Sequence, residues 1–189
     1  MQNKQDKTEE EKHVNKWIEK LNCSDSNWIN GDKLSKGKTA DIINDKLKIA
    51  IELKREKGQS LDNTHGNLEK ISNRLDDYFK LSNEKFINYP EFKTLLLIEL
   101  KTCIDTAILS MKGIQSLHIN NGELIGKSLR NNQLYTKTNN IGGIILWPAP
   151  ENFLSKNCYY FINPKSSTEK QLSLAEVKTI FNNNFILSK

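Results

Sequence analysis

The sequence predicts an α/β fold in which helices flank a mixed sheet, in the order helix, three strands, helix, strand, with additional C-terminal elements. Two observations lead to this prediction: some segments carry apolar residues at helical spacing, and others are short runs rich in β-branched residues. The 189 residues, 37% of them hydrophobic, can bury one ordinary core. We therefore expect a single domain, 1–189, with a polar tail at 1–8, a core at 9–113 and C-terminal strands and a helix at 114–189 that complete or extend the sheet.

The first helix is expected at about residues 9–22, because Thr8 and Glu11 have capping-box spacing. Its apolar residues fall on one stripe: Val14, Trp17, Ile18 and Leu21. A short strand at Trp28 and Ile29 follows. After it comes a basic loop with three lysines: Lys33, Lys36 and Lys38.

Two apolar runs, 40–43 and 47–53, then predict a β-hairpin. Side chains alternate along a strand, so Glu52 and Lys54 share one face of the second run while Leu47, Ile49, Ile51 and Leu53 form the apolar face. A charged pair is thus expected on one side of a strand whose other side is core.

The position of the hairpin tip decides which residue lies opposite Glu52. In an antiparallel hairpin the residue numbers of each facing pair add up to the same value, and the tip sets that value. A tip at residues 46–47 places Asp41 opposite Glu52, with Cβ atoms roughly 5 Å apart. A turn at residues 44–45, which local turn propensity favours, places Asp41 opposite Lys48 and about 13 Å from Glu52 along the strand. The residues leave both registers open.

The remaining elements are predicted from the same signals. A helix is expected from Asn67 to before Pro90, and residues 92–111 fit either one helix or a buried strand at 95–100 that runs into a helix. Further expected elements are a hairpin around 120–122, buried strands at 141–147 and 159–162, and a last helix capped by Ser173.

Asp41, Glu52 and Lys54 are the residue types that phosphodiester hydrolysis needs. Carboxylates hold Mg²⁺ against a phosphate oxygen, and a cation near the attacking water stabilises hydroxide and the charge of the transition state. The late hairpin tip would bring the two acids and the lysine onto one surface.

The string DIINDKLKIAIELK, from Asp41 to Lys54, resembles the PD-(D/E)xK nuclease superfamily, which includes many restriction endonucleases, and looks most like archaeal Holliday junction resolvases. The resemblance covers about residues 9–56, and Ala40 stands where the family usually has proline. It implies a restriction endonuclease-like core, αβββαβ, and a Mg²⁺-dependent endonuclease of restriction, repair or junction-cleaving type, with Mn²⁺ as a substitute metal.

The resemblance also implies roles for single residues. Asp41 and Glu52 would bind the metal, and Lys54 would position or activate the attacking water. Glu11 matches the acidic residue on the first helix that commonly joins the metal ligands in this superfamily, and Glu10 is the reserve candidate.

The composition is compatible with a polyanionic partner. The formal charge is +5, which favours DNA, with RNA not excluded, and Lys33, Lys36 and Lys38 are the candidate phosphate contacts. An A- and T-rich coding sequence would also explain the many Asn and Lys residues. The sequence has no long apolar stretch, so a cytoplasmic protein is expected, and cutting both strands of a duplex would favour a homodimer.

Each functional interpretation has a simpler alternative. Glu52 and Lys54 could form a solvated strand face, Glu11 could serve only in a capping box, and the second IELK string at residues 98–101 is expected to be structural. The competing functions are an inactive nuclease fold that binds nucleic acid and a protein-interaction or adaptor protein.

Overall fold

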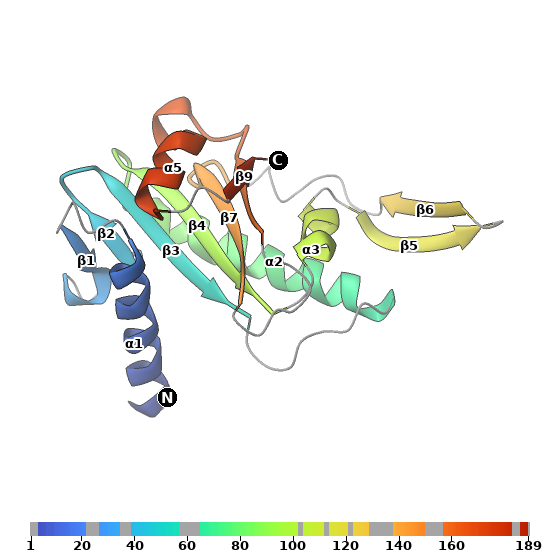
Figure 1. Cartoon of the computed structure of the whole chain (residues 1–189), viewed down its shortest axis with the longest axis horizontal. Helices are drawn as coiled ribbons and strands as arrows, with labels where there is room; N and C mark the ends of the chain where they lie inside the picture. Colours follow the sequence, from blue (N-terminus) through green and yellow to red (C-terminus); the bar gives the residue numbers. More distant parts are fainter. Residues whose placement is uncertain are drawn as a thin grey trace.

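The computed structural model describes residues 4–21, 27–34, 39–56, 65–101, 104–111, 114–120, 123–128, 138–149, 157–182 and 186–188. Its central feature is a seven-stranded sheet in the order β1-β2-β3-β4-β7-β8-β9 (Figure 1). The strands are β1 (Trp28–Asn30), β2 (Ile42–Asn44), β3 (Ile49–Arg55), β4 (Lys93–Leu100), β7 (Gly143–Pro148), β8 (Cys158–Ile162) and β9 (Ile186–Ser188).

The sheet is mixed, as predicted for an α/β fold. Strands β3, β4 and β7 run parallel to one another, and so do β8 and β9. The pairs β1–β2, β2–β3 and β7–β8 are antiparallel. The C-terminal strands β7, β8 and β9 extend the same sheet beyond β4.

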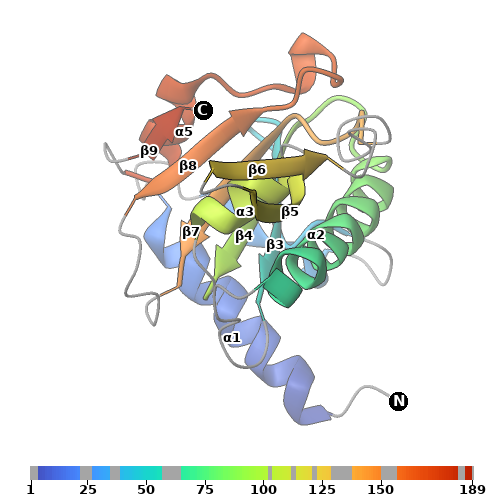
Figure 2. The ribbon, with the colours of Figure 1, turned by 90° about the vertical axis from the view of Figure 1, so that its right-hand side faces the viewer.

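Helices cover both faces of this sheet (Figure 2). The helices α2 (His65–Phe86) and α3 (Ile104–Met111) pack on one face, and α1 (Lys4–Lys20) and α5 (Leu174–Ile180) pack on the other. The described residues also form two short 3₁₀ helices, η1 (Gly31–Lys33) and η2 (Thr168–Lys170). No helix in the described segments combines the length and the apolar composition that a bilayer crossing needs.

The N-terminal end of α1 differs from the prediction. The helix begins at Lys4 and not at Glu9, so Thr8 lies inside it and does not cap it. The reason is that Lys4, Gln5 and Lys7 of the supposed tail are strong helix formers. The predicted capping role of Thr8 and Glu11 is therefore wrong.

The region after α2 resolves an alternative that the sequence leaves open. Residues 93–100 form the buried strand β4, and the helix α3 starts only at Ile104. The residues from Thr94 to Leu100 are all buried, because neighbouring parallel strands and helices on both faces enclose them.

Several C-terminal predictions are confirmed. A separate hairpin of β5 (Ile114–Asn120) and β6 (Glu123–Ser128) closes with Asn120 opposite Glu123. Ser173 caps α5 in a full capping box with Glu176. The short strand β9 is not predicted by the sequence.

Cys158 is a free, buried cysteine in β8, and burial raises the pKa of its thiol to about 12. It is therefore an inert thiol that belongs to the core. Cys23 and Cys103 lie outside the described residues.

Candidate active site

The β2–β3 hairpin has the late tip. Ile42 pairs with Ile51 and Asn44 pairs with Ile49, so the residue numbers of each facing pair add up to 93 and Asp41 lies opposite Glu52. The early turn at residues 44–45 is excluded because the buried Asn44 side chain accepts a hydrogen bond from the Leu47 amide at 3.0 Å. Asn44 thereby starts the turn and cannot occupy its centre.

Asp41 directly precedes β2 and is held by main-chain contacts. The Leu53 N–H donates to Asp41 Oδ2 at 2.8 Å, and the Gly31 N–H donates to the Asp41 carbonyl at 2.9 Å. The neighbouring Ala40 N–H donates to the Tyr89 hydroxyl at 3.1 Å. Proline has no N–H and could not make this contact, so alanine at position 40 supplies a hydrogen bond that a proline there would lack.

Glu52 projects from β3 on the same face as Ala50, beneath α2. The sequence predicts a charged residue on an open side of the strand, but the Glu52 side chain is 0% exposed because α2 covers this face too. Burial, followed by the charge of Asp41, raises the pKa of Glu52 to about 7. The interpretation of Glu52 as part of a solvated face is therefore wrong.

Two lysines hold the Glu52 carboxylate. Lys54, two residues along β3, approaches Glu52 Oε1 to 2.6 Å, as the alternation of the strand predicts. Lys85, from the last turn of α2, lies 2.7 Å from Glu52 Oε1 and 2.9 Å from Oε2. Its Nζ atom also lies 3.3 Å from Asp41 Oδ1, so one ammonium joins both carboxylates.

Lys85 is the site residue that sequence reasoning missed. Burial opposes its charge, but the carboxylates of Asp41 and Glu52 outweigh that effect and raise the pKa of Lys85. A signal was present in α2: the inward stripe that includes Ile71, Leu75, Tyr78 and Ser82 continues at helical spacing to Lys85. A lysine on a buried stripe calls for a buried acidic partner.

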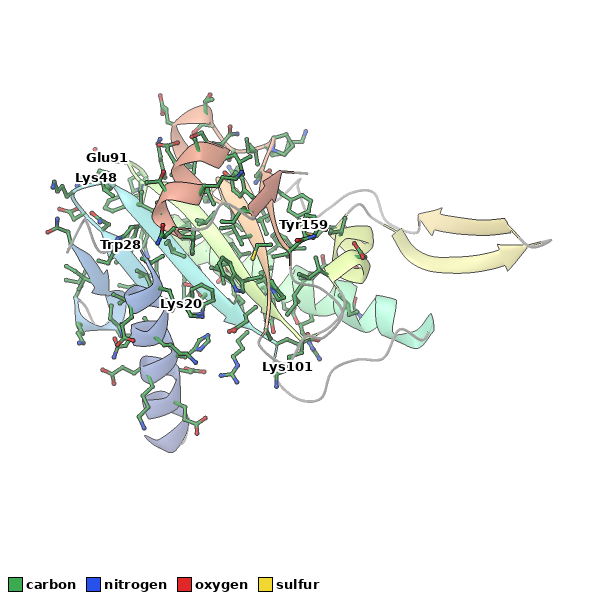
Figure 3. All side chains as sticks on the ribbon, in the orientation of Figure 1. Lys20, Trp28, Lys48, Glu91, Lys101 and Tyr159 are labelled. Atoms are coloured by element: carbon green, nitrogen blue, oxygen red, sulfur yellow. The ribbon has the colours of Figure 1, made fainter. Side chains whose placement is uncertain are left out.

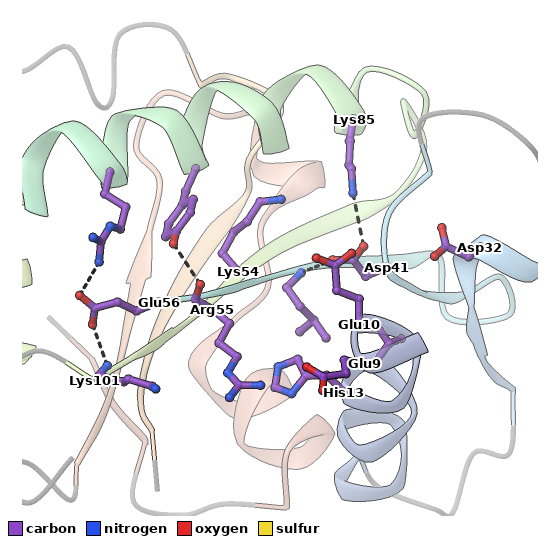
Figure 4. Close-up of a pocket in the computed structure, with 14 residues that line it drawn as sticks. Glu9, Glu10, His13, Asp32, Asp41, Lys54, Arg55, Glu56, Lys85 and Lys101 are labelled. Carbon is purple, nitrogen blue, oxygen red and sulfur yellow. Dashed lines mark hydrogen bonds and ion pairs between the residues drawn. The ribbon is translucent and has the colours of Figure 1, made fainter. Parts of the chain in front are cut away.

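Asp41, Lys54 and Lys85 border a pocket of about 700 Å³ between α1, β3 and α2, while Glu52 lies buried behind its wall (Figure 4). Residues from several elements line it: Glu9, Glu10, His13, Val14, Asp32, Asp41, Leu53, Lys54, Arg55, Glu56, Arg74, Tyr78, Lys85 and Lys101.

The first helix presents Glu10, and not Glu11, to this pocket. Glu11 is exposed and is not among the lining residues, whereas Glu10 and His13 are, because positions three apart share a helix face. The reserve candidate Glu10 is thus better placed than Glu11 to assist Asp41 and Glu52.

Another carboxylate, that of Glu56, lies at the end of the pocket away from Asp41 and Glu52. Glu56 is buried; it accepts from Arg74 at 2.7 Å and from the Lys101 amide at 2.8 Å. Lys101 follows β4 and lies at the end of the sheet opposite to Lys48 (Figure 3). The pocket therefore runs along β3, from the carboxylate pair to a more basic end.

The second IELK string also contributes to this region. Glu99 is buried in β4, and its Oε2 atom lies 3.2 Å from His13 Nε2. Burial opposes the charge of Glu99, but the hydrogen bond and charge of His13 lower its pKa. Glu99 thus anchors α1 to the sheet, in agreement with the structural role expected for this string.

The basic loop is only partly described. Lys33 ends η1 and is exposed, although it is not among the residues that line the pocket. Lys36 and Lys38 lie outside the described residues.

Asp41 and Glu52 offer oxygen ligands to a divalent cation, but the site offers few protein ligands in total. Asp41 and Glu52 converge on a single cation, the Lys85 ammonium, and their oxygens are the hard ligands that Mg²⁺ prefers. Within the described segments, no group of three or more His, Cys, Asp and Glu residues is arranged to hold a metal ion. The site thus suits a metal that takes two carboxylates and fills its other positions with water and substrate oxygens.

Comparisons with protein-family models, curated proteins and solved structures gave no significant match to this chain.

Proposed function

We propose that this chain has a restriction endonuclease-like core and is a metal-dependent endonuclease that hydrolyses phosphodiester bonds in DNA. One observation carries the proposal: the hairpin register puts Asp41 opposite Glu52, and the two carboxylates and Lys54 gather on one face of β3. This is the arrangement that the resemblance of residues 41–54 to the PD-(D/E)xK superfamily implies.

The order of elements supports the same proposal. From α1 to β4 the chain runs helix, three antiparallel strands, helix, strand, with β4 parallel to β3. This is the αβββαβ order expected for such a core. The site lies where β2 begins and near the carboxyl end of β3, beside the pocket.

Each residue has a role in the proposed reaction. Asp41 and Glu52 would hold a divalent cation, with Glu10 as a further acid on the pocket wall. Bound there, Mg²⁺ would act as a Lewis acid toward a phosphate oxygen. Lys54 donates to Glu52 in the present structure and would orient the attacking water and stabilise negative charge in the transition state.

The pocket wall suits a phosphate backbone. Lys54, Arg55, Arg74 and Lys101 line it alongside the acids Glu9, Glu10, Asp32 and Glu56, and the whole chain has a formal charge of +5. Cations of this kind contact phosphates without reading sequence, so the substrate proposed is DNA of unspecified sequence. Cleavage of both strands by one site per chain would be served by a homodimer.

A direct test is DNA cleavage with Mg²⁺ by the wild-type protein, Glu52→Gln and Lys54→Met. We expect both variants to keep their circular dichroism spectrum and to lose at least about 100-fold in rate, as happens when a single group that stabilises the transition state is removed. Lys80→Met is the matched control, because Lys80 is exposed on α2 and does not line the pocket. Full activity in both site variants would refute the proposal.

A second candidate function is a nuclease fold that only binds nucleic acid. The observation in its favour is that Lys54 and Lys85 already neutralise the two carboxylates. It predicts DNA binding without cleavage in Mg²⁺ or Mn²⁺, and no loss of affinity for DNA when Glu52 is replaced by Gln.

A further inference from the structure

The ammonium of Lys85 occupies the point at which the two carboxylates meet. It contacts both oxygens of Glu52, Oε1 at 2.7 Å and Oε2 at 2.9 Å, and Asp41 Oδ1 at 3.3 Å. Glu52 Oε1 also accepts from Lys54, and Asp41 Oδ2 accepts from the Leu53 amide. Lys85 is therefore the cation that bridges the two carboxylates.

A divalent cation that joined Asp41 to Glu52 would need the bridging position that the Lys85 ammonium now occupies. A metal ion and this ammonium cannot both occupy that position, because a bridging cation must lie within bonding distance of both carboxylates. Lys54 is different, since it approaches Glu52 Oε1 from its own strand and does not bridge the pair. Metal binding and the present position of Lys85 are thus mutually exclusive, whereas Lys54 can stay.

We propose that Lys85 is an intramolecular counter-ion that holds the Asp41–Glu52 pair together in the metal-free protein and is displaced when a divalent cation binds. This inference rests on the metal site of the proposed function. Its consequence is that Lys85 lowers the affinity of the site for metal, because every binding event must first break the contacts of Lys85 with both carboxylates.

The position of Lys85 allows its side chain to move away from the carboxylates. It sits in the last turn of α2 on a flexible four-carbon side chain that is 25% exposed, and it lines the pocket. A side-chain rotation alone can move its ammonium off the carboxylates and into the pocket, without a change in the sheet. There it would add a positive charge beside Lys54, where the proposed substrate carries its phosphate.

Calorimetric titration with Mn²⁺ tests this inference on the full chain. We expect Lys85→Met to bind Mn²⁺ at least about fivefold more tightly than the wild type, because the competing cation is gone. The matched control is Lys93→Met, which removes an ion pair of the same kind with Glu176, away from the site. Its affinity for Mn²⁺ should stay within about twofold of the wild-type value, since distant sites act independently.

The outcomes separate this inference from the proposed function. If the wild type binds Mn²⁺ and Lys85→Met binds it equally well or more weakly, the counter-ion role is overturned and the metal site stands. If neither protein binds Mn²⁺, the metal site fails and the counter-ion role fails with it. If Lys85→Met binds Mn²⁺ and the wild type does not, the result supports both the metal site and the counter-ion role. It also shows that Lys85 blocks the site in the wild type.

A measurement on the wild-type protein covers the case in which Lys85→Met does not fold. In protein with ¹³C- and ¹⁵N-labelled lysine, the side-chain signals of Lys85 should move when Mg²⁺ is added, while those of Lys93 should not. Unmoved Lys85 signals in protein that has bound Mg²⁺ would overturn the inference.

Discussion

At the scale of single residues, the site is organised by the burial of one glutamate. Glu52 is fully enclosed, its carboxylate lies near that of Asp41, and two lysines reach it from β3 and α2. The opposing effects of burial and of the lysine charges leave the pKa of Glu52 at about 7. A bound divalent cation would favour the ionised form, which couples metal affinity to pH.

The raised pKa of Glu52 predicts how stability depends on pH. Because its folded-state pKa of about 7 lies above the ordinary value of 4.5, the folded protein binds this proton more tightly than the unfolded chain. The resulting stabilisation is fully present below pH 4.5 and is lost as the pH rises through about 7.

Glu52→Gln cannot titrate and should lack this dependence. The free energy of unfolding of Glu52→Gln minus that of the wild type should therefore increase between pH 4.5 and pH 8, by on the order of 3 kcal/mol. Urea unfolding of both proteins at several pH values measures it. A difference that stays constant with pH would show that Glu52 titrates normally in the folded protein.

At the scale of elements, the junction between η1 and β2 sets the position of Asp41. Gly31 pairs with the Asp41 carbonyl, and a Cβ atom on residue 31 would lie 1.9 Å from the Ala40 carbonyl oxygen. Only glycine allows this approach, because the clash is with main chain that cannot rotate away.

Gly31→Ala should consequently destabilise the fold and displace Asp41. We expect the free energy of unfolding to fall by more than about 2 kcal/mol, as in other overpacked sites. Lys33→Ala, at an exposed position of the same 3₁₀ helix, should change it by less than about 0.5 kcal/mol. Equal stability of the two variants would mean that the chain relaxes at this junction without cost.

Local patterns predict some of these elements and fail on others for physical reasons. The alternation along β3 suffices to put Glu52 and Lys54 on one face, since it depends only on neighbouring residues. The hairpin tip depends on the Asn44 side chain, which can either start a turn or occupy its centre, so both registers stay open in the sequence. Lys85 is 33 residues from Glu52, and only the packing of α2 on the sheet brings them together.

At the scale of the whole molecule, helices on both faces make the site a buried one. The sequence predicts the α/β class and the order of the first six elements, but not that α2 covers the charged face of β3. That coverage buries Glu52, while the partly exposed Asp41, Lys54 and Lys85 border a pocket of about 700 Å³. Burial of the Glu52 carboxylate away from bulk solvent strengthens its electrostatic interactions.

Binding of DNA by this pocket and by the basic loop should depend steeply on salt. With Ca²⁺ in place of Mg²⁺ to limit cleavage, affinity for a DNA duplex should fall at least about tenfold between 50 and 200 mM salt, because phosphate contacts release counterions. Lys33→Ala tests the loop: it should weaken binding and make the slope shallower by about one unit. Fluorescence anisotropy measures both. An adaptor protein would show no salt-dependent affinity for DNA or RNA.

The most direct test of the central claim is a crystal structure of the wild-type protein soaked in Mn²⁺, with the anomalous signal measured. We expect an anomalous peak bonded to both Asp41 and Glu52, with Lys85 withdrawn from the pair into the pocket. A structure in which Mn²⁺ lies elsewhere, or in which Lys85 still joins the two carboxylates at saturating Mn²⁺, would contradict it.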